Sequence, residues 1–509
     1  MGERGGRETC TIGADLGTTN AKAIAFDARG REIARAETSV PLLHHGGDAA
    51  EQDPRAVYDG ATGVLVQCAR AAWQHGYVVE RVGLSAAMHS IVPVSADGTP
   101  LTNALTWMDT RAGPEAAALW QSEQGKGIYA RTGTPIHPMS PLPKLIWIRE
   151  QQPQIFQTAY KFVSLKEWVW YRWFGEWAVD ASLASATGLY NLRERAWDAE
   201  ALAVAGIDAD RLSRLVPTTY VRRGVRDKRL FDAGIASDAA FNVGASDGVL
   251  ANLGVGAVDA STMVLTIGTS LAARSGTRVP VTDPATQLFC YVLDADRYIA
   301  GGPSNNGGIV LDWLYHKVLS GGGAPAAGTD GFADLIAAAE RAPTGPLLCL
   351  PYVAGERAPL WAGGAKAVFF GLQLDDTAAT LIRAAIEGMI LNAYWIASSL
   401  FAQLGKPEQM LATGKVLETD WIRRLTADVF GLPVRFRGAV DASVLGAATL
   451  ANIAAGLWTW DEAIARESQE QASTAYPTRE HDTYQRKFAR FQRLAQALTG
   501  DLADLYLSE

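Results

Sequence analysis

The chain has 509 residues, of which 48% are hydrophobic and 20% charged, and its formal net charge is −8. These values are typical of a soluble globular protein and exclude a disordered or fibrous one, while the length favours at least two domains. The acidic balance argues against a nucleic-acid binder, which needs a basic face, but allows a small anionic ligand.

The N-terminal residues carry no apolar signal-peptide core, and Gly6 breaks the myristoylation pattern. No uninterrupted apolar run is long enough to span a bilayer. The four cysteines form no CxxC pair, which predicts reduced core thiols rather than disulfides or a zinc site. We therefore expect a cytoplasmic protein that associates with neither a membrane nor a nucleic acid.

In chain order, the first half opens on three predicted strands, at residues 11–14, 21–26 and 32–38. Asp53 and Pro54 then match an N-cap and the first position of a helix whose apolar residues fall on one face. The next predicted strand, in RVGLSAAMHSIVPV, runs into a polar trio. The first half thus reads as a strand meander followed by alternating helices and strands.

The second half repeats this opening. Residues 261–276 again predict a strand, a Gly-Thr-Ser turn and a second strand, and the meander continues through FCYVLD and RYIAGG. A long helix over 381–404 and a helix over 419–431 flank a short strand. The repeat supports two lobes of like topology, which we divide into domains 1–253 and 254–509. GGGAPAAG, residues 321–328, predicts a flexible surface loop.

The two turns, ADLGTTNAK and TIGTS, hold more polar groups than a turn requires. Gly17 and Gly268 let the backbone approach a ligand, and the neighbouring hydroxyl and N–H groups donate to phosphate oxygens. Lys22 adds a point charge, and a carboxylate at Asp15 beside phosphates implies a cation such as Mg²⁺. A structural turn is the alternative for either segment alone, but the pair favours a polyphosphate clamp.

Asp247, in GASDGVLANLG, is the next acidic candidate. Phosphoryl transfer to a hydroxyl needs a carboxylate that orients the attacking oxygen and accepts its proton. A turn or helix-cap aspartate is an equally open alternative, because aspartate is common in both places.

Motifs along nearly the whole chain, in order, resemble the FGGY family of carbohydrate kinases. They include DLGTTNAK, LSAAMHSIVPV, ALTWMDTRA, GASDGVLANLG, LTIGTS, GGPSNNGGIVLDW and PYVAGERAPLW. MSPLPKLIWIREQ fits the first family signature at every position. Residues 367–387 fit the second except at Thr380, where an acidic, amide or histidine side chain is usual. Within the family, RTGTPIHPM and DASLASATGLYNL are most similar to members that act on gluconate.

This resemblance implies an α/β fold of two ribonuclease-H-like lobes, as in actin and hexokinase, with a cleft between them. It implies ATP-dependent phosphorylation of D-gluconate to 6-phospho-D-gluconate, with Mg²⁺ near Asp15 and Asp247 as the general base. The positions that match the phosphate and nucleotide loops are Gly17, Thr18, Thr19, Lys22, Gly268, Thr269, Ser270, Gly308, Asp312 and Gly414. Those that match the sugar pocket are Met88, His89, Trp107 and Asp109.

Two residues depart from the family pattern near the nucleotide. Leu271 stands in the second loop and Lys415 in the adenine loop, and either side chain would crowd the nucleotide. Lys415 is equally able to pair with a phosphate. Glu356 and Arg357, in GERAP, form either a structural ion pair or a pair that faces the cleft.

A gluconate pocket needs a cation or several donors opposite Asp247, because a buried carboxylate without them is very costly. Arg111, His89 and Arg131 are the candidates, and Arg111 is equally a structural partner for Asp109. Two other functions stay open: a kinase for another sugar or polyol, with D-xylulose first, and a non-catalytic sugar-binding relative. The expected partners are a sugar acid and ATP, and the resemblance leaves room for a homodimer.

Overall fold

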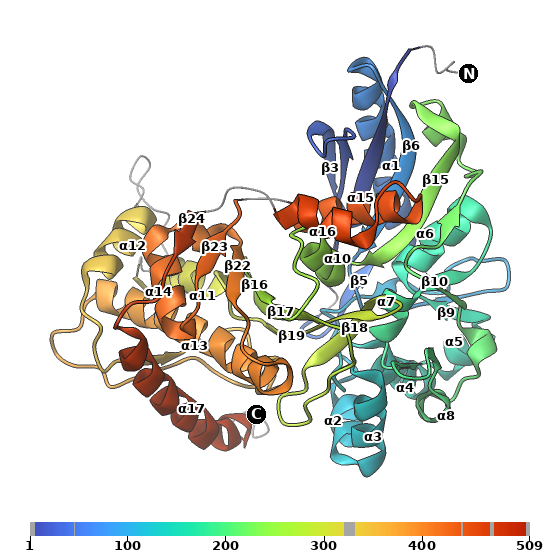
Figure 1. The fold of residues 1–509 in the computed structure, drawn as a ribbon. Helices are drawn as coiled ribbons and strands as arrows, with labels where there is room; N and C mark the ends of the chain where they lie inside the picture. Colours follow the sequence, from blue (N-terminus) through green and yellow to red (C-terminus); the bar gives the residue numbers. More distant parts are fainter. Residues whose placement is uncertain (1–5, 45, 320–330, 439–440, 469–472, 505–509) are drawn as a thin grey trace.

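The computed structural model describes residues 6–44, 46–319, 331–438, 441–468 and 473–504. They form two α/β lobes, each built around a mixed sheet (Figure 1). The predicted loop at 321–328 lies outside the described residues.

The first sheet has the strand order β14-β15-β6-β1-β2-β3. Its strands are β1 (Glu8–Leu16), β2 (Asn20–Phe26), β3 (Glu32–Ser39), β6 (Tyr77–Ala86), β14 (Val221–Arg222) and β15 (Ile235–Ser246). β1, β2 and β3 form the predicted antiparallel meander, and β6 and β15 continue the sheet in parallel beyond β1. The three predicted opening strands are confirmed, with ends that extend beyond the predicted ones.

The second sheet has the strand order β18-β19-β17-β16-β22-β23-β24. Its strands are β16 (Thr262–Ile267), β17 (Leu271–Thr277), β18 (Phe289–Asp294), β19 (Arg297–Ser304), β22 (Gln409–Thr413), β23 (Val434–Phe436) and β24 (Ser473–Ala475). β16 pairs antiparallel with β17 and parallel with β22, as β1 pairs with β2 and β6. The predicted pair of lobes of like topology is therefore confirmed.

Helices and short strands fill the rest of the first lobe. Helix α1 (Pro54–Gln74) begins after Asp53, whose carboxylate accepts from the Arg55 N–H at 2.9 Å, as predicted. The other helices are α2 (Gly113–Gln121), α3 (Glu123–Thr132), α4 (Pro141–Gln151), α5 (Pro153–Thr158), α6 (Leu165–Phe174), α7 (Ala181–Ser185), α8 (Ala199–Ala205), the 3₁₀ turn η1 (Ala209–Arg211), α9 (Lys228–Phe231) and α10 (Asp247–Leu253). The short strands are β4 (Leu43–His44), β5 (Ala50–Gln52), β7 (Val92–Val94), β8 (Ala104–Leu105), β9 (Lys161–Val163), β10 (Ala178–Asp180), β11 (Tyr190–Asn191), β12 (Ala196–Trp197) and β13 (Arg214–Val216).

The second lobe is organised around α13 (Ala378–Leu404). This helix is long and apolar enough to cross a membrane, but 78% of its apolar window is buried, so it is the core helix of the lobe. The remaining elements of this half are α11 (Ile309–Trp313), η2 (Leu314–Leu319), α12 (Gly331–Arg341), β20 (Leu348–Leu350), β21 (Val368–Phe370), η3 (Lys415–Glu418), α14 (Asp420–Phe430), α15 (Ala442–Ala454), α16 (Trp460–Ser468) and α17 (His481–Asp504).

The departure at Thr380 has a local explanation. Thr377 caps α13, and the Thr380 hydroxyl accepts a hydrogen bond from the Thr377 N–H at 2.8 Å. In a capping box this position needs a side chain that accepts from the N-cap backbone. A threonine hydroxyl performs that task here.

One helix of the C-terminal half packs on the first lobe. Figure 1 shows α15 beside α10, and its backbone lies directly on β1 and β6. A Cβ at Gly13 would collide with the Val444 carbonyl, and one at Gly83 with the Ala447 carbonyl. Glycine at both positions therefore allows α15 to approach the sheet closely enough to reach the end of β1.

Candidate active site

Asp15 is the last polar residue of β1, and its carboxylate is held by two serines. Oδ1 accepts from the Ser85 hydroxyl at 2.7 Å, and Oδ2 accepts from the Ser443 hydroxyl of α15 at 3.1 Å. Burial raises the pKa of Asp15, while these two hydrogen bonds lower it. One of the two groups that orient this carboxylate therefore comes from the C-terminal half of the chain.

Asp247 lies at the same edge of the first sheet. It follows β15 as the first residue of α10, and one of its oxygens accepts from the Gly248 N–H at 2.6 Å. In the sheet register, Asp15 and Ala245 both pair with Ser85 of β6, so β1 and β15 end at the same edge of the sheet, on either side of β6. Asp247 is therefore the first residue of a helix, as expected if it has a structural role at a helix start. It also lies at the same edge of the sheet as Asp15.

The two carboxylates affect each other. Burial, followed by the negative charge of Asp15, raises the pKa of Asp247 to about 7. A carboxylate whose pKa lies near neutrality is well matched to accept a proton from a hydroxyl and release it again. Two carboxylates in one buried site also suit Mg²⁺, which is usually held by one or two carboxylates and by the phosphates of its substrate.

The first predicted phosphate loop is a tight turn after β1. The Gly17 N–H donates to the Asn20 carbonyl at 3.1 Å, and a Cβ at Gly17 would lie 2.7 Å from that oxygen. Thr18 accepts from the Trp107 indole N–H at 2.9 Å, while Thr19 is exposed. Lys22 forms an ion pair of 3.2 Å with Asp441, the N-cap residue of α15.

The second loop is packed against the other predicted nucleotide positions. The Gly308 N–H donates to the Gly268 carbonyl at 2.7 Å, and the Ile309 N–H to that of Thr269 at 3.1 Å. Gly414, with a φ of 100°, lies so close to the Ile267 carbonyl that a Cβ would collide with it. The structure thus brings Gly268, Gly308 and Gly414 together, with Ser270 at the end of the turn.

Three further residues of this region were singled out from the sequence. The Leu271 side chain is 2% exposed and belongs to the core of the second lobe, so it does not project from the loop. Lys415 is exposed at the start of η3. Asp312 is also exposed, with His316 3.4 Å away.

Of the predicted sugar-pocket residues, Met88 and His89 follow the end of β6, the strand that lies between β1 and β15. Met88 contacts the start of α10, because a Cβ on Gly248 would lie 3.3 Å from the Met88 methyl group. The His89 Nδ1 lies 2.8 Å from the Ala186 carbonyl, so Nδ1 carries the proton and Nε2 is left as an acceptor. Burial lowers the pKa of His89 to about 3, which keeps the ring neutral.

Lys144, in the first family signature, ties the loops of this pocket together. Its ammonium donates to the carbonyls of His89 at 3.2 Å, Thr106 at 2.7 Å and Met139 at 2.5 Å. These three bonds fix His89 and the residue before Trp107, and they fix Met139, whose N–H donates to His137. Sequence reasoning quoted this signature without giving Lys144 a task.

The arginines predicted to meet a sugar carboxylate are both paired with protein carboxylates. Arg111 donates to Asp109 at 2.6 Å and to Glu51 at 2.5 Å, and Asp109 is fully buried. Arg131 forms bonds of 2.7 Å with Asp198 and with Glu200. The geometry matches the structural use of Arg111, and its contact with substrate stays a prediction.

Arg274 and Ser443 are residues of this region that sequence reasoning missed. A Cβ on Gly248 would lie 3.4 Å from the Arg274 Nε, and the charge of this arginine lowers the pKa of Asp247. A charged residue in the core-type strand LAARSG was the signal available for Arg274. Ser443 gave no signal, because it lies 428 residues from Asp15 in the chain.

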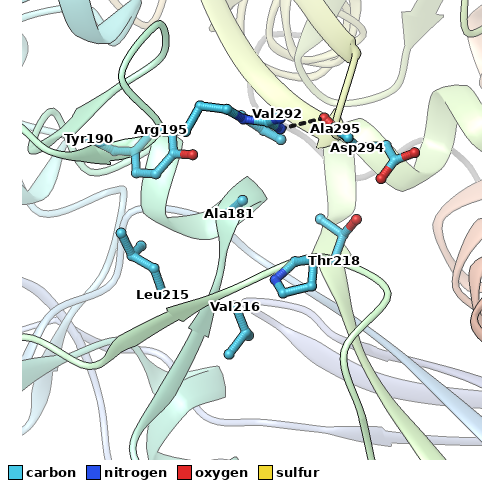
Figure 2. Close-up of a pocket in the computed structure, with 10 residues that line it drawn as sticks. Ala181, Tyr190, Arg195, Leu215, Val216, Thr218, Val292, Asp294 and Ala295 are labelled. Atoms are coloured by element: carbon cyan, nitrogen blue, oxygen red, sulfur yellow. Dashed lines mark hydrogen bonds between the residues drawn. The ribbon is translucent and has the colours of Figure 1, made fainter.

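The structure also contains cavities apart from these residues. One of 260 Å³ lies between β11, β13 and the turn after β18, and Figure 2 shows Arg195 reaching across it to donate to the Asp294 carbonyl at 3.1 Å. Its lining residues include none of the predicted site residues. A second cavity of 500 Å³ is lined by parts of α12, α13 and α17.

The fold defines the class of the protein: two ribonuclease-H-like lobes, each with a glycine-rich turn after its first strand, and two carboxylates at one sheet edge. Residues 10–254 match the N-terminal domain of the FGGY family of carbohydrate kinases, and residues 263–455 match its C-terminal domain. The chain therefore belongs to the FGGY family of carbohydrate kinases.

Individual relatives narrow the comparison. The chain is 39% identical over 451 residues to a gluconokinase of Bacillus licheniformis, a match that covers 87% of each chain. It superposes on gluconate kinase from Lactobacillus acidophilus with a TM-score of 0.92 and 32% identity, covering 98% of this chain and 99% of that one. For a ligand-bound xylulose kinase from the same organism, the TM-score is 0.91 and the identity 32%, and the match covers 98% of this chain and 100% of that one.

Proposed function

We propose that the protein is an ATP-dependent gluconate kinase, which transfers the γ-phosphoryl group of ATP to the terminal hydroxyl of D-gluconate and produces 6-phospho-D-gluconate and ADP. The observation that carries this proposal is the position of Asp247, beside Asp15 and Arg274, with its pKa raised to about 7. The 39% identity to a gluconokinase supports the choice of substrate.

In this mechanism Asp247 orients the terminal hydroxyl and accepts its proton as the oxygen attacks the γ-phosphorus. The bond between the γ-phosphorus and the bridging oxygen breaks, and ADP leaves with that oxygen. Asp15, oriented by Ser85 and Ser443, would hold Mg²⁺, which would supply the positive charge that balances the β- and γ-phosphates. The two glycine turns donate backbone N–H groups to the phosphates.

Two alternatives differ in substrate and in activity. D-xylulose also offers a terminal hydroxyl, and the superposition on a xylulose kinase is nearly as close as that on a gluconate kinase. A non-catalytic sugar-binding protein was suggested by Leu271 and Lys415. The burial of Leu271 in the lobe core weakens that alternative, because the side chain leaves the loop free for a nucleotide. The cytoplasmic location and the homodimer stay predictions.

The test combines a substrate panel with one variant. At saturating ATP and Mg²⁺, kcat/KM for D-gluconate should exceed that for D-xylulose and glycerol by at least ~10², because a site that bonds a substrate group strongly rejects analogues without it. Asp247→Asn should lower kcat by at least ~10² while gluconate still binds, since the amide keeps the shape but accepts no proton. A better rate with xylulose or glycerol would reject gluconate as the substrate. A variant that keeps more than about a tenth of the activity would reject Asp247 as the base.

A further inference from the structure

The guanidinium of Arg357 is a partly buried cation, with a buried Nε and no carboxylate partner among the described residues. Its neighbour Glu356 is already occupied: Oε2 accepts from Ser304, Asn306 and Asn392, and Oε1 accepts from two backbone N–H groups. The side chain of Arg357 makes only a long bond of 3.4 Å to the Ser304 carbonyl. Its Nε is buried with no hydrogen-bond partner in the part of the chain that the structure describes.

Arg357 belongs to the second lobe but reaches the predicted sugar pocket of the first. Its guanidinium lies 5.2 Å from the centre of the Trp107 ring, and Trp107 in turn donates to Thr18 of the first phosphate loop. The positive charge of Arg357 also lowers the pKa of His89 and of His137. The arginine therefore faces the pocket rather than Glu356.

A second unpaired donor lies near enough for the positive charge of Arg357 to act on its pKa. The Tyr291 hydroxyl is buried and has no hydrogen-bond partner among the described residues, and its ring stacks on Phe289 with centroids 4.6 Å apart. Its ring centroid lies 6.0 Å from that of His89. Burial raises the pKa of Tyr291, so the hydroxyl keeps its proton. Two buried unpaired donors in one pocket indicate that a ligand completes them, because such groups are rarely left unsatisfied.

The histidines of the pocket are neutral and add no competing cation. The Met139 N–H donates to the His137 Nδ1 at 3.1 Å, so the proton of this ring is on Nε2. Burial lowers the pKa of both His89 and His137 to about 3. Arg274, the other arginine nearby, lies against Gly248 next to Asp247, at the phosphoryl-transfer end.

We propose that the Arg357 guanidinium and the Tyr291 hydroxyl bind the carboxylate of the sugar acid, at the end of the substrate opposite Asp247. This inference rests on the proposed function and assigns the cation that a gluconate pocket requires. Arg111 and Arg131 are already neutralised by protein carboxylates, whereas no carboxylate in the described part of the chain pairs with Arg357. A guanidinium and a hydroxyl supply the charge-assisted hydrogen bonds that a carboxylate needs when it leaves water.

The test uses D-gluconate and D-gluconamide, which have the same chain and hydroxyls but differ in the charge of the far end. Arg357→Met should lower kcat/KM for gluconate by at least ~10², since the carboxylate would be buried without a cation, and should change that for gluconamide by less than about fivefold. Tyr291→Phe removes one neutral donor and should lower kcat/KM for gluconate by about tenfold. Because the Tyr291 hydroxyl has no hydrogen-bond partner among the residues that the structure describes, this variant should fold normally.

Matched controls come from the cavity in Figure 2. Arg195→Met and Tyr190→Phe make the same chemical changes outside the predicted site, and they should leave both substrates within about twofold of the unmodified protein. Thermal unfolding checks that each variant is folded.

The outcomes separate this inference from the proposed function. If the unmodified protein prefers xylulose, the proposed function is wrong, and the assignment of a carboxylate site is wrong as well. If the protein prefers gluconate but Arg357→Met and Tyr291→Phe lower the rates with gluconate and gluconamide equally, the function stands and the carboxylate assignment is wrong. Selective loss of gluconate in both variants supports it.

Discussion

Burial, followed by repulsion from Asp15, sets the protonation of the candidate base Asp247. Burial disfavours the charged form of each carboxylate, and the negative charge of Asp15 further raises the pKa of Asp247. Arg274 acts in the opposite direction, because its positive charge favours ionised Asp247. The activity of the base therefore depends on two neighbours of opposite charge.

This balance predicts how the acid limb of kcat/KM moves with pH. The limb reports the base of the free enzyme, which must lose its proton to work, so activity should fall below a pH of about 7. Asp15→Asn removes a negative charge, lowers the pKa of Asp247 and should shift the limb to lower pH by roughly half a unit or more. Arg274→Met removes a positive charge and should shift it to higher pH.

Both variants are measured on their residual activity, with Mg²⁺ saturating at each pH. Arg195→Met, a charge change outside the predicted site, is the control and should leave the limb in place. Shifts of the same sign in Asp15→Asn and Arg274→Met would contradict the assignment of the limb to Asp247.

At the scale of elements, α15 links the two halves of the sequence. It packs on β1, β6 and α10, and it carries Ser443 to the Asp15 carboxylate. Thr11 of β1 donates to the Asn452 side chain at the other end of the helix, at 2.8 Å. The close approach depends on glycines in the sheet that leave room for the helix backbone.

Two glycine-to-alanine variants should therefore change stability in opposite directions. Gly13→Ala places a methyl group against the Val444 carbonyl and should destabilise the protein by about 1–3 kcal/mol or more, because the backbone of α15 must move. Gly63→Ala, inside α1 with open space around its Cβ, should stabilise by about 0.5–1 kcal/mol, because alanine favours the helix.

Urea unfolding of both variants provides the measurement. Gly13→Ala should also raise the Mg²⁺ concentration needed for half-maximal activity, because Ser443 moves with α15. Gly63→Ala should leave that concentration unchanged. Equal stability of the two variants would show that α15 does not rest on β1 as described.

The elements that the sequence predicted are those specified by local chemistry. Asp53 and Pro54 mark the start of α1, and the turn at Gly17 separates β1 from β2, so neighbouring residues suffice for both. The position of α15 was not predicted, because Gly13 and Gly83 look like ordinary strand glycines until the helix is in place. The sequence also left open whether Arg357 pairs with Glu356 or faces the cleft. The reason is the same, because donors from distant segments occupy Glu356.

At the scale of the whole molecule, we expect the adenine end of ATP and the sugar to meet different lobes, while the phosphates meet a glycine turn from each lobe. Gly268, Gly308, Gly414 and Lys415 all belong to the second lobe, while Met88, His89 and Trp107 belong to the first. Arg357 and Tyr291 are the exceptions, because they extend from the second lobe into the predicted sugar pocket. Changes near Gly414 should thus affect ATP alone, and changes at Arg357 should affect the sugar.

Lys415 offers the clearest test of this division. Its side chain is exposed beside Gly414, so we expect its charge to attract the anionic nucleotide without contributing to the fold. The KM for ATP should rise from the unmodified protein to Lys415→Gln and again to Lys415→Glu. Each step should be about two- to fivefold, which is the range of an exposed charge interaction. The KM for gluconate should stay within about twofold.

The same substitutions at Lys406, exposed after α13, should change neither KM. The ATP effect should shrink in about 0.5 M salt, because ions screen exposed charges. A rise in the gluconate KM with an unchanged ATP KM would show that the adenine loop has been assigned to the wrong segment.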